Sequence, residues 1–527
     1  MPDAPPPRRF GGALAVGTGI FLSRIAGLVR ERVLAHYLGL SIAADAFRAA
    51  LKIPNFLQNM LGEGVLSASL IPVYARLRAE GRHEDASRVA RTVGTLLALV
   101  ASVLALIGVV AARPLVETLA PGFEVETREL TITLVRILFP GMSLLVMSAW
   151  CLGVLNSHRR FFLSYVSPVL WNAALNVAAI VAGQRGDDTI ALWVAWGAVF
   201  GSAAQFLIQL PTAIALLRSA RPSLAVRDEG VRTTLRAFVP ILFGRGSVQI
   251  SAFIDQVLAS LLATGLYAAI SAAQTLYLLP VSLFGMSVSA AELPEMSSAT
   301  GDDRARAEHL QKRLASGLRR VVFFVVPSAI AFVAIGGSVV ALIYQSGRFT
   351  AEDTEIVWLI LAGAAIGLVP STQSRLLGSA FYALGDPKRP LHASLVRVAT
   401  SALLGFSFVV PLRDAFGYSA VWGAFALTAS SGVAAWIEFA LLRRWLAARI
   451  GGVPVPVKLL AGTLGAAALA GAAGFSAGHL ARELGATSWA AALVAIPTFG
   501  AIYLGVMVAA RVPEVSAITR RIPGLRR

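Results

Sequence analysis

The chain of 527 residues is strongly apolar and basic, with 56% hydrophobic residues, 14% charged residues and a formal net charge of +17. A mean hydropathy of +0.71 excludes an ordinary soluble globular protein. The single cysteine, Cys151, excludes an internal disulfide. We therefore expect a polytopic membrane protein of the all-α class.

The chain opens with a short basic tail rich in proline, residues 1–11. The apolar segment that follows is longer than the core of about 7 to 15 residues in a secretory signal peptide. No cleavage site of small residues comes after it. We expect an uncleaved signal anchor and a tail that stays in the cytoplasm.

Apolar stretches recur from this segment to the end of the chain, separated by charged turns or by turns containing Gly and Pro. About 20 apolar residues are enough for a helix to cross the hydrocarbon core of a bilayer. We predict fourteen transmembrane helices, near residues 12–38, 43–75, 92–112, 130–156, 162–183, 189–217, 236–263, 266–298, 318–345, 356–384, 390–411, 417–442, 456–480 and 487–510.

A short internal similarity indicates a repeat. Residues 31–35 read ERVLA and residues 255–259 read DQVLA, and the predicted helix after each copy holds two prolines. Six helices separate the copies, and an even number preserves orientation, so the repeat is parallel. We predict two six-helix lobes around a central cavity, with two further helices and a basic tail. The segments are 12–217, a basic cytoplasmic linker at 218–235, 236–442, 443–510 and 511–527.

Lys and Arg in the predicted loops alternate between the two sides of the membrane. With a cytoplasmic amino terminus, most of the 46 basic residues fall in inside segments, whereas the outside loops hold few of them and many acids. Basic residues in short loops mark the cytoplasmic side. Both termini are therefore expected inside. The net charge is explained by topology and by contact with anionic lipid, which argues against a nucleic-acid partner.

The first two predicted helices carry charges where an unpaired charge costs at least about 2.5 kcal/mol. Polar residues follow one another at steps of three or four along the second of these helices and so share one face. We predict that this face lines a water-filled cavity. The stripe consists of Asp45, Arg48, Lys52, Asn55, Asn59, Glu63 and Ser67.

Two pairs of charges are placed for interaction by helical spacing. Arg24 and Glu31 lie seven residues apart on nearly one face, so they could pair. Arg245 and Asp255 lie ten residues apart in the helix at 236–263, facing similarly at about 15 Å. This second pair is expected either to bind substrate and a coupling ion separately or to pair with other helices.

Pro54 is predicted to interrupt the second helix beside Lys52 and Asn55, because proline removes a backbone donor. The kink would serve packing, a gate or a ligand site. Arg397, near the end of its predicted span, is expected to snorkel to the interface.

The sequence contains no set of catalytic residues, no nucleotide-binding G-x-x-x-x-G-K motif and no cysteine and histidine spacing typical of a metal site. We therefore expect a transporter, not an enzyme. Without a cofactor or an ATPase motif, transport would be coupled to the membrane potential or to a monovalent ion.

Three runs carry a resemblance to a known family: FLSRIAGLVRE at 21–31, ADAFRAALKIPNFLQ at 44–58 and GEGVLSASLIPVY at 62–74. They closely resemble the opening of the MurJ (MviN) family of lipid II flippases. Weaker matches are APGF at 120–123, the turn at 156–161, YQSGRFT at 344–350 and FYALGDPK at 381–388.

The resemblance implies a fourteen-helix, two-lobe member of the multidrug/oligosaccharidyl-lipid/polysaccharide exporter superfamily. It implies alternating-access transport of lipid II, an undecaprenyl-pyrophosphate-linked disaccharide pentapeptide, to the outer leaflet of the bacterial cytoplasmic membrane for peptidoglycan and cell wall biogenesis. The implied partners are lipid II, membrane lipids and the cell-wall synthesis machinery. Arginine suits this substrate, since its paired donors match a pyrophosphate.

Carried over by position, Arg24 and Arg30 match the two arginines of the family's first helix, and Asp45 and Glu63 match its acids. Two departures stand out: Gln58 occupies a position where some members have arginine, and the arginine of the eighth helix is missing. We hypothesise that Arg245, together with Lys52, supplies the lost positive charge. The expected substrate-binding residues are Arg24, Arg30, Lys52, Asn55 and Arg245, and those for gating or ion coupling are Glu31, Asp45, Glu63 and Asp255.

Other functions are compatible with this fold. One alternative is a polysaccharide-lipid flippase or a drug/cation antiporter of the same superfamily, although a cation exporter would want acids to dominate the cavity. The first two helices instead hold more basic than acidic residues. Another alternative is a membrane scaffold that transports nothing.

Overall fold

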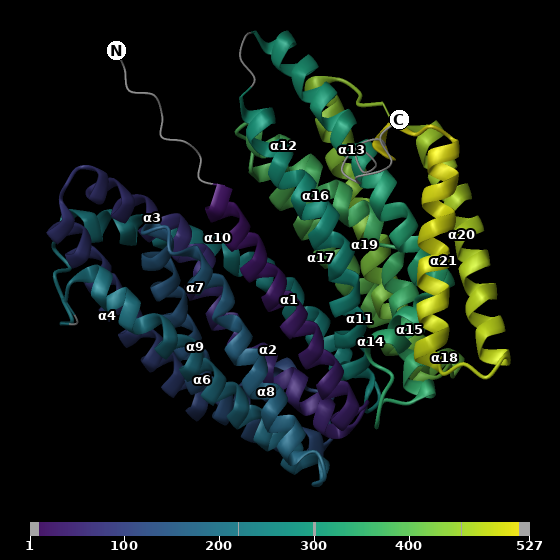
Figure 1. The fold of residues 1–527 in the computed structure, drawn as a ribbon, viewed down its shortest axis with the longest axis horizontal. Coiled ribbons are helices and arrows are strands. Elements are labelled where there is room, and N and C mark those ends of the chain that lie inside the picture. Colours follow the sequence, from purple (N-terminus) through teal and green to yellow (C-terminus); the bar gives the residue numbers. More distant parts are fainter. Residues whose placement is uncertain (1–9, 220, 299–301, 455, 516–527) are drawn as a thin grey trace. The chain divides into compact units, whose positions relative to one another are not determined.

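The computed structural model describes residues 10–219, 221–298, 302–454 and 456–515. Within these ranges the chain folds into α-helices and one π-helix, and the sole β-feature is an isolated bridge between Ser346 and Phe349. The predicted all-α class is confirmed. Contacts divide the chain into two units, Met1–Ser260 and Leu261–Arg527, which are described separately below (Figure 1).

Unit 1 is built around α6, a helix of 33 residues that packs against α2, α3, α4 and α9. Trp150 of α6 donates its indole N–H to the carbonyl of Ala90, 2.9 Å away. Gly94 of α4 makes room for this ring, because a Cβ there would lie 2.6 Å from it. The elements of this unit are α1 (Phe10–Leu38), α2 (Ile42–Leu61), α3 (Glu63–Ala79), α4 (His83–Val110), α5 (Ala112–Leu119), α6 (Val125–Ser157), α7 (Phe161–Val166), α8 (Pro168–Ala182), α9 (Asp187–Leu217) and α10 (Glu229–Ser260).

The predicted helix at 43–75 is two helices, α2 and α3, and the interruption lies at Gly62. α2 continues through Pro54 as one helix, and the kink predicted there stays a prediction. A proline removes one helix bond, a loss that neighbouring groups can accommodate. At Gly62 the N–H donates to the Gln58 carbonyl at 2.8 Å, and a Cβ would lie 2.2 Å from that oxygen. Only glycine fits this close approach.

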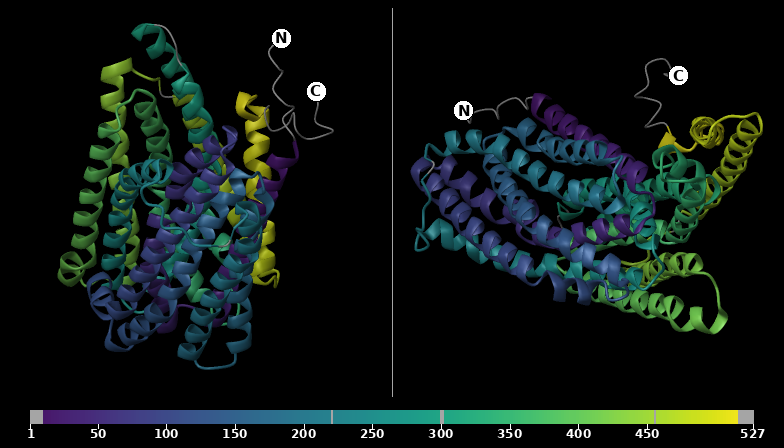
Figure 2. Two further views of the ribbon diagram at one scale, coloured as in Figure 1. Left: turned by 90° about the vertical axis from the view of Figure 1, so that its left-hand side faces the viewer. Right: turned by 90° about the horizontal axis from the view of Figure 1, so that it is seen from below.

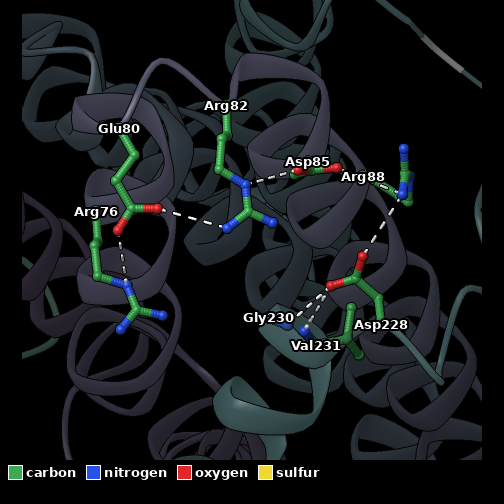
Figure 3. A network of polar contacts seen from close by, with 8 residues as sticks. All are labelled: Arg76, Glu80, Arg82, Asp85, Arg88, Asp228, Gly230 and Val231. Carbon is green, nitrogen blue, oxygen red and sulfur yellow. Dashed lines mark hydrogen bonds and ion pairs between the residues drawn. The ribbon is translucent and has the colours of Figure 1, made fainter.

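Ion pairs fasten α10 to the end of unit 1 that carries the turn between α3 and α4 (Figure 3). Asp228 caps α10 by accepting from the N–H groups of Gly230 and Val231, at 2.9 and 3.4 Å. The same carboxylate lies 3.7 Å from Arg88 of α4. The chain of contacts continues through Asp85, Arg82, Glu80 and Arg76. Exposed pairs of this kind contribute up to about 1 kcal/mol each, so they orient α10 more than they stabilise it.

Unit 2 holds the remaining helices, and its π-helix follows Pro280 directly. α20 and α21, yellow in Figure 2, lie side by side and pack against α13 and α14. Tyr503 of α21 donates a hydrogen bond to the Phe323 carbonyl of α13 at 2.6 Å. The elements are α11 (Leu266–Pro280), η1 (Val281–Met286), α12 (Ser287–Ser297), α13 (Asp303–Ala334), α14 (Gly336–Ile343), α15 (Ala351–Ala365), α16 (Leu368–Ala383), α17 (Lys388–Val409), α18 (Pro411–Phe416), α19 (Ala420–Ile450), α20 (Val457–Glu483) and α21 (Ser488–Ala509).

Ten helical segments of the described chain are long and apolar enough to cross a membrane. There are eleven if α15 and α16, bent by 42°, form one span. The chain is thus a multi-pass membrane protein, and the count of fourteen stays a prediction. α2 is not counted among these segments because its 20 residues include three charged ones, Asp45, Arg48 and Lys52.

The division at Ser260 differs from the predicted lobes in one respect. α10 groups with unit 1, where it packs against α2, α3, α4 and α5, although the predicted second lobe begins with the helix at 236–263. The six-helix lobes and their pseudo-repeat stay a prediction.

Candidate functional site

A buried carboxylate on α1 organises the charges of α1 and α2. Glu31 accepts hydrogen bonds from Arg30 Nη2 at 2.6 Å and from Arg48 Nη1 at 3.0 Å. The suggested pair of Glu31 with Arg24 is therefore wrong, and Arg24 is exposed. Packing of α2 brings Arg48 from 17 positions away, which helical spacing along α1 does not predict. Two guanidinium groups thus share one carboxylate, and these three side chains carry a summed formal charge of +1.

A second pair of charges joins α2 to α10. Asp255 of α10 interacts electrostatically with Lys52 of α2, and both side chains are half-buried. The alternative in which Asp255 pairs with another helix is thereby favoured. Asp45 is buried in the first turn of α2, where a carboxylate is stabilised by the helix N-terminus. The side chains of Glu63 and Arg245 lie outside the described part of the structure, so their predicted roles stay predictions.

A cavity of about 970 Å³ opens within unit 1, between α1, α2, α3, α6, α7, α8 and α9. Of the predicted binding residues, Arg30 and Asn55 line it, whereas Arg24 and Lys52 are not among the described lining residues. The predicted polar stripe on α2 and α3 continues along it through Asn59 and Ser67. The uncharged members of the stripe thus line the cavity, whereas Asp45, Arg48 and Lys52 are not among its described lining residues, and Arg48 and Lys52 interact with acids.

The guanidinium of Arg30 sits between its acid and an aromatic ring. Its Cζ lies 5.1 Å from the ring centroid of Trp171 on α8, within the range of a cation–π contact. Its buried Nε has no hydrogen-bond partner among the described residues. Arg30 thus has donor capacity left at the cavity wall, and a phosphate oxygen is the acceptor that suits it.

The wall of the cavity on α6, α8 and α9 contains residues that were not predicted from the sequence. Gln205 of α9 donates to Ser148 Oγ of α6 at 3.1 Å, and Asn172 of α8 donates to the Pro168 carbonyl at 2.9 Å. Both amides line the cavity together with Trp171. An amide within an otherwise apolar membrane span costs free energy unless it faces protein or water. The presence of these amides in apolar spans is therefore the sequence signal that could have identified them.

His158 lies in the turn after α6, outside the spans. Tyr74 Oη and His158 Nε2 are 2.8 Å apart, and Arg78 donates to the Ser157 carbonyl at 2.9 Å. Burial, together with the positive charges of Arg78, Arg160 and His83, lowers the pKa of His158 to about 4. The imidazole is therefore neutral near pH 7, and its contact with Tyr74 fastens α3 to the turn after α6.

Comparisons with known proteins identify the family of this chain. The sequence model of the family described as "Lipid II flippase MurJ" matches residues 34–495. The lipid II flippase MurJ of Burkholderia cenocepacia is 31% identical over 440 residues, covering 82% of this chain and 83% of that protein. The probable lipid II flippase MurJ of Thermotoga maritima is 28% identical over 398 residues, covering 75% and 79%.

Solved structures share the fold. A lipid II flippase MurJ in an inward closed conformation superposes with a TM-score of 0.74 at 21% identity, covering 94% of this chain and 99% of that one. An inward-facing multidrug transporter of the MATE family, in the MOP superfamily, gives a TM-score of 0.65 at 17% identity, covering 83% and 98%. The family match spans most of the sequence and the expected resemblance is confirmed: the chain belongs to the lipid II flippase MurJ family, a family of transporters and not of enzymes.

Proposed function

We propose that this protein translocates lipid II from the inner to the outer leaflet of the bacterial cytoplasmic membrane by alternating access. The observation that carries the proposal is a polar cavity of about 970 Å³, with Arg30 in its wall, in a member of the MurJ family. The pyrophosphate would bind at Arg30, which has an unused donor, while the prenyl chain stays in lipid. Differential binding of the substrate in two states would drive the conformational change.

The test is depletion of an essential lipid II flippase and complementation with this chain. We expect growth to be restored and lipid II to become accessible at the outer leaflet. Arg136 of α6 provides a matched control, because it is an exposed arginine of the same unit outside the cavity lining. Arg30→Ala should abolish rescue and Arg136→Ala should preserve it. Failure of the inserted wild-type chain would overturn the proposal and favour a related lipid-linked polysaccharide as substrate.

The basic loops support cytoplasmic termini. Coupling to the membrane potential or to a monovalent ion is expected, and Glu31, Asp45, Glu63 and Asp255 are the acids proposed for it. Dissipating the potential in cells that depend on this chain should then stop lipid II from reaching the outer leaflet. Contact with the cell-wall synthesis machinery is the partner interaction that this function predicts.

The positive charge absent at Gln58 is proposed to come from Arg245 and Lys52. Gln58 lines the cavity, which supports a site weaker in charge on that side. Arg245→Ala should lower lipid II flipping and complementation. Undiminished flipping by this variant would show that the idea is wrong.

A further inference from the structure

The cavity wall made by α6, α8 and α9 carries hydrogen-bonding groups of its own, in addition to the guanidinium of Arg30 on α1 that would bind a phosphate. Five primary amides and three hydroxyls line the described cavity, while Arg30 is the single cation among the described lining residues. Amides and hydroxyls both donate and accept, so the surface suits a neutral ligand rich in the same groups. These residues are Asn55, Gln58, Asn59, Asn172, Gln205, Ser67, Ser148 and Ser164.

This wall is held in place from behind by Gln209. Its Nε2 donates to Ser148 Oγ at 2.6 Å and to Ser167 Oγ at 2.8 Å, and the residue is fully buried. Ser148 also accepts from Gln205. Since Ser148 accepts twice, its own proton remains for another partner. The buried network thus presents a hydroxyl donor at a fixed position in the wall.

Two further polar groups of the wall are unpartnered. Asn172 is 5% exposed, and its Nδ2 is used by the Pro168 carbonyl, while its Oδ1 has no hydrogen-bond partner among the described residues. The same holds for the indole Nε1 of Trp171. Buried polar groups are seldom left without partners, so an acceptor and a donor on consecutive residues that line a cavity point to a ligand.

We propose that Ser148, Trp171, Asn172 and Gln205 form a saccharide subsite, which binds an N-acetylated sugar attached to the phosphate held by Arg30. The inference rests on the proposed function. Trp171 contacts Arg30, so the two subsites are adjacent, as a sugar joined directly to a phosphate requires. The acetamido and hydroxyl groups of the sugar supply both donors and acceptors. A peptide with free carboxylates would need more cations than this wall offers, and a prenyl chain would leave its polar groups unpaired.

Binding to the purified full-length protein in nanodiscs tests this inference with three ligands. They are undecaprenyl pyrophosphate, its disaccharide derivative without peptide, and complete lipid II. Asn172→Leu and Gln205→Leu should each weaken binding of the two glycosylated ligands by about tenfold, the loss expected for one buried hydrogen bond. Their affinity for undecaprenyl pyrophosphate should not change. Trp171→Phe keeps an aromatic side chain but loses the indole N–H, and it should show the same selectivity.

Asn176→Leu is the matched control, since it lies one turn from Asn172 on α8 and outside the described cavity lining, and it should alter no affinity. Thermal unfolding of each variant confirms folding. Equal losses for glycosylated and bare ligands, or no loss, would overturn the subsite. If the substitutions weakened the binding of complete lipid II alone, the wall would bind peptide and the saccharide assignment would be wrong. If the folded wild-type protein bound none of the ligands, the proposed function itself would fail.

Discussion

Each unit contains one buried glutamate held by two arginines, and the two clusters differ in what surrounds the arginines. Glu31 in unit 1 binds Arg30 and Arg48, whose side chains are 20% and 16% exposed. Glu292 of α12 in unit 2 binds Arg313 and Arg320 of α13, which are 31% and 49% exposed. The same three-residue arrangement therefore places its arginines beside a cavity in one unit and nearer to solvent in the other.

The difference separates a binding device from a structural one. An arginine that is mostly buried, stacked on Trp171 and short of one hydrogen bond has reason to bind a substrate anion. Arg313 has a further acid, Glu295 at 3.2 Å, and lies in the segment predicted to be cytoplasmic. Arg397, expected to snorkel, provides a third case: it pairs with Glu438 of α19 at 3.1 Å, which leaves no surplus charge. Position beside a cavity matters more than the ion pair itself.

Substituting each glutamate should give the largest losses of folding free energy. The loss should be greater for Glu31 than for Glu292. Glu31→Ala removes the buried carboxylate that Arg30 and Arg48 both contact, which should cost about 3 to 5 kcal/mol of folding free energy. Glu292→Ala should cost about 1 to 2 kcal/mol, because its arginines can be rehydrated. Thermal unfolding of the detergent-purified variants measures the difference. Equal losses would show that arginine exposure does not separate the clusters.

Arginine substitutions should separate the clusters by function. Arg30→Ala should lower lipid II flipping by about tenfold to a hundredfold, the contribution of one or two charge-assisted hydrogen bonds. Arg30→Lys should recover part of this, since it keeps the charge and loses the planar fork. Arg313→Ala is the comparison from unit 2 and should flip lipid II at nearly the wild-type rate. A transport assay in proteoliposomes would contradict the distinction if both alanine variants failed alike.

Much of the polar surface near Glu31 was predictable from the sequence. The polar residues from Asp45 to Ser67 follow helical spacing, and such a stripe in an apolar helix requires water or polar groups beside it. The partner of Glu31 was not predictable, since Arg48 reaches it only through the packing of α1 against α2. Asn172 and Gln205 were also missed. Each is an isolated amide in an apolar span, and no periodic pattern connects residues that meet across α6, α8 and α9.

Glycine substitutions should give a smaller loss that again differs between units. Gly62 lies between α2 and α3, two helices that line the cavity. Gly62→Ala places a Cβ 2.2 Å from the Gln58 carbonyl oxygen. We expect a loss of about 1 to 3 kcal/mol, as for other overpacked sites. Gly378→Ala in α16 of unit 2 meets no atom within 4 Å and should be neutral or slightly stabilising. Melting temperatures of the two variants check the contrast, and a stable Gly62→Ala would show that the break tolerates a side chain.

The smallest predicted effect concerns the turn after α6 and depends on pH. His158 has a pKa of about 4 in the folded protein, against an ordinary value of 6.5, so the folded state binds fewer protons than the unfolded state. Stability is therefore complete above about pH 6.5 and falls as the pH drops toward 4. After discounting for solvent screening, the loss should be about 1 to 2 kcal/mol. His158→Gln keeps a polar partner for Tyr74 but cannot titrate, so its melting temperature should fall less between pH 7 and pH 4. If the variant and the wild-type protein lost stability in parallel, carboxylates of the ion-pair clusters, and not this turn, would control the acid response.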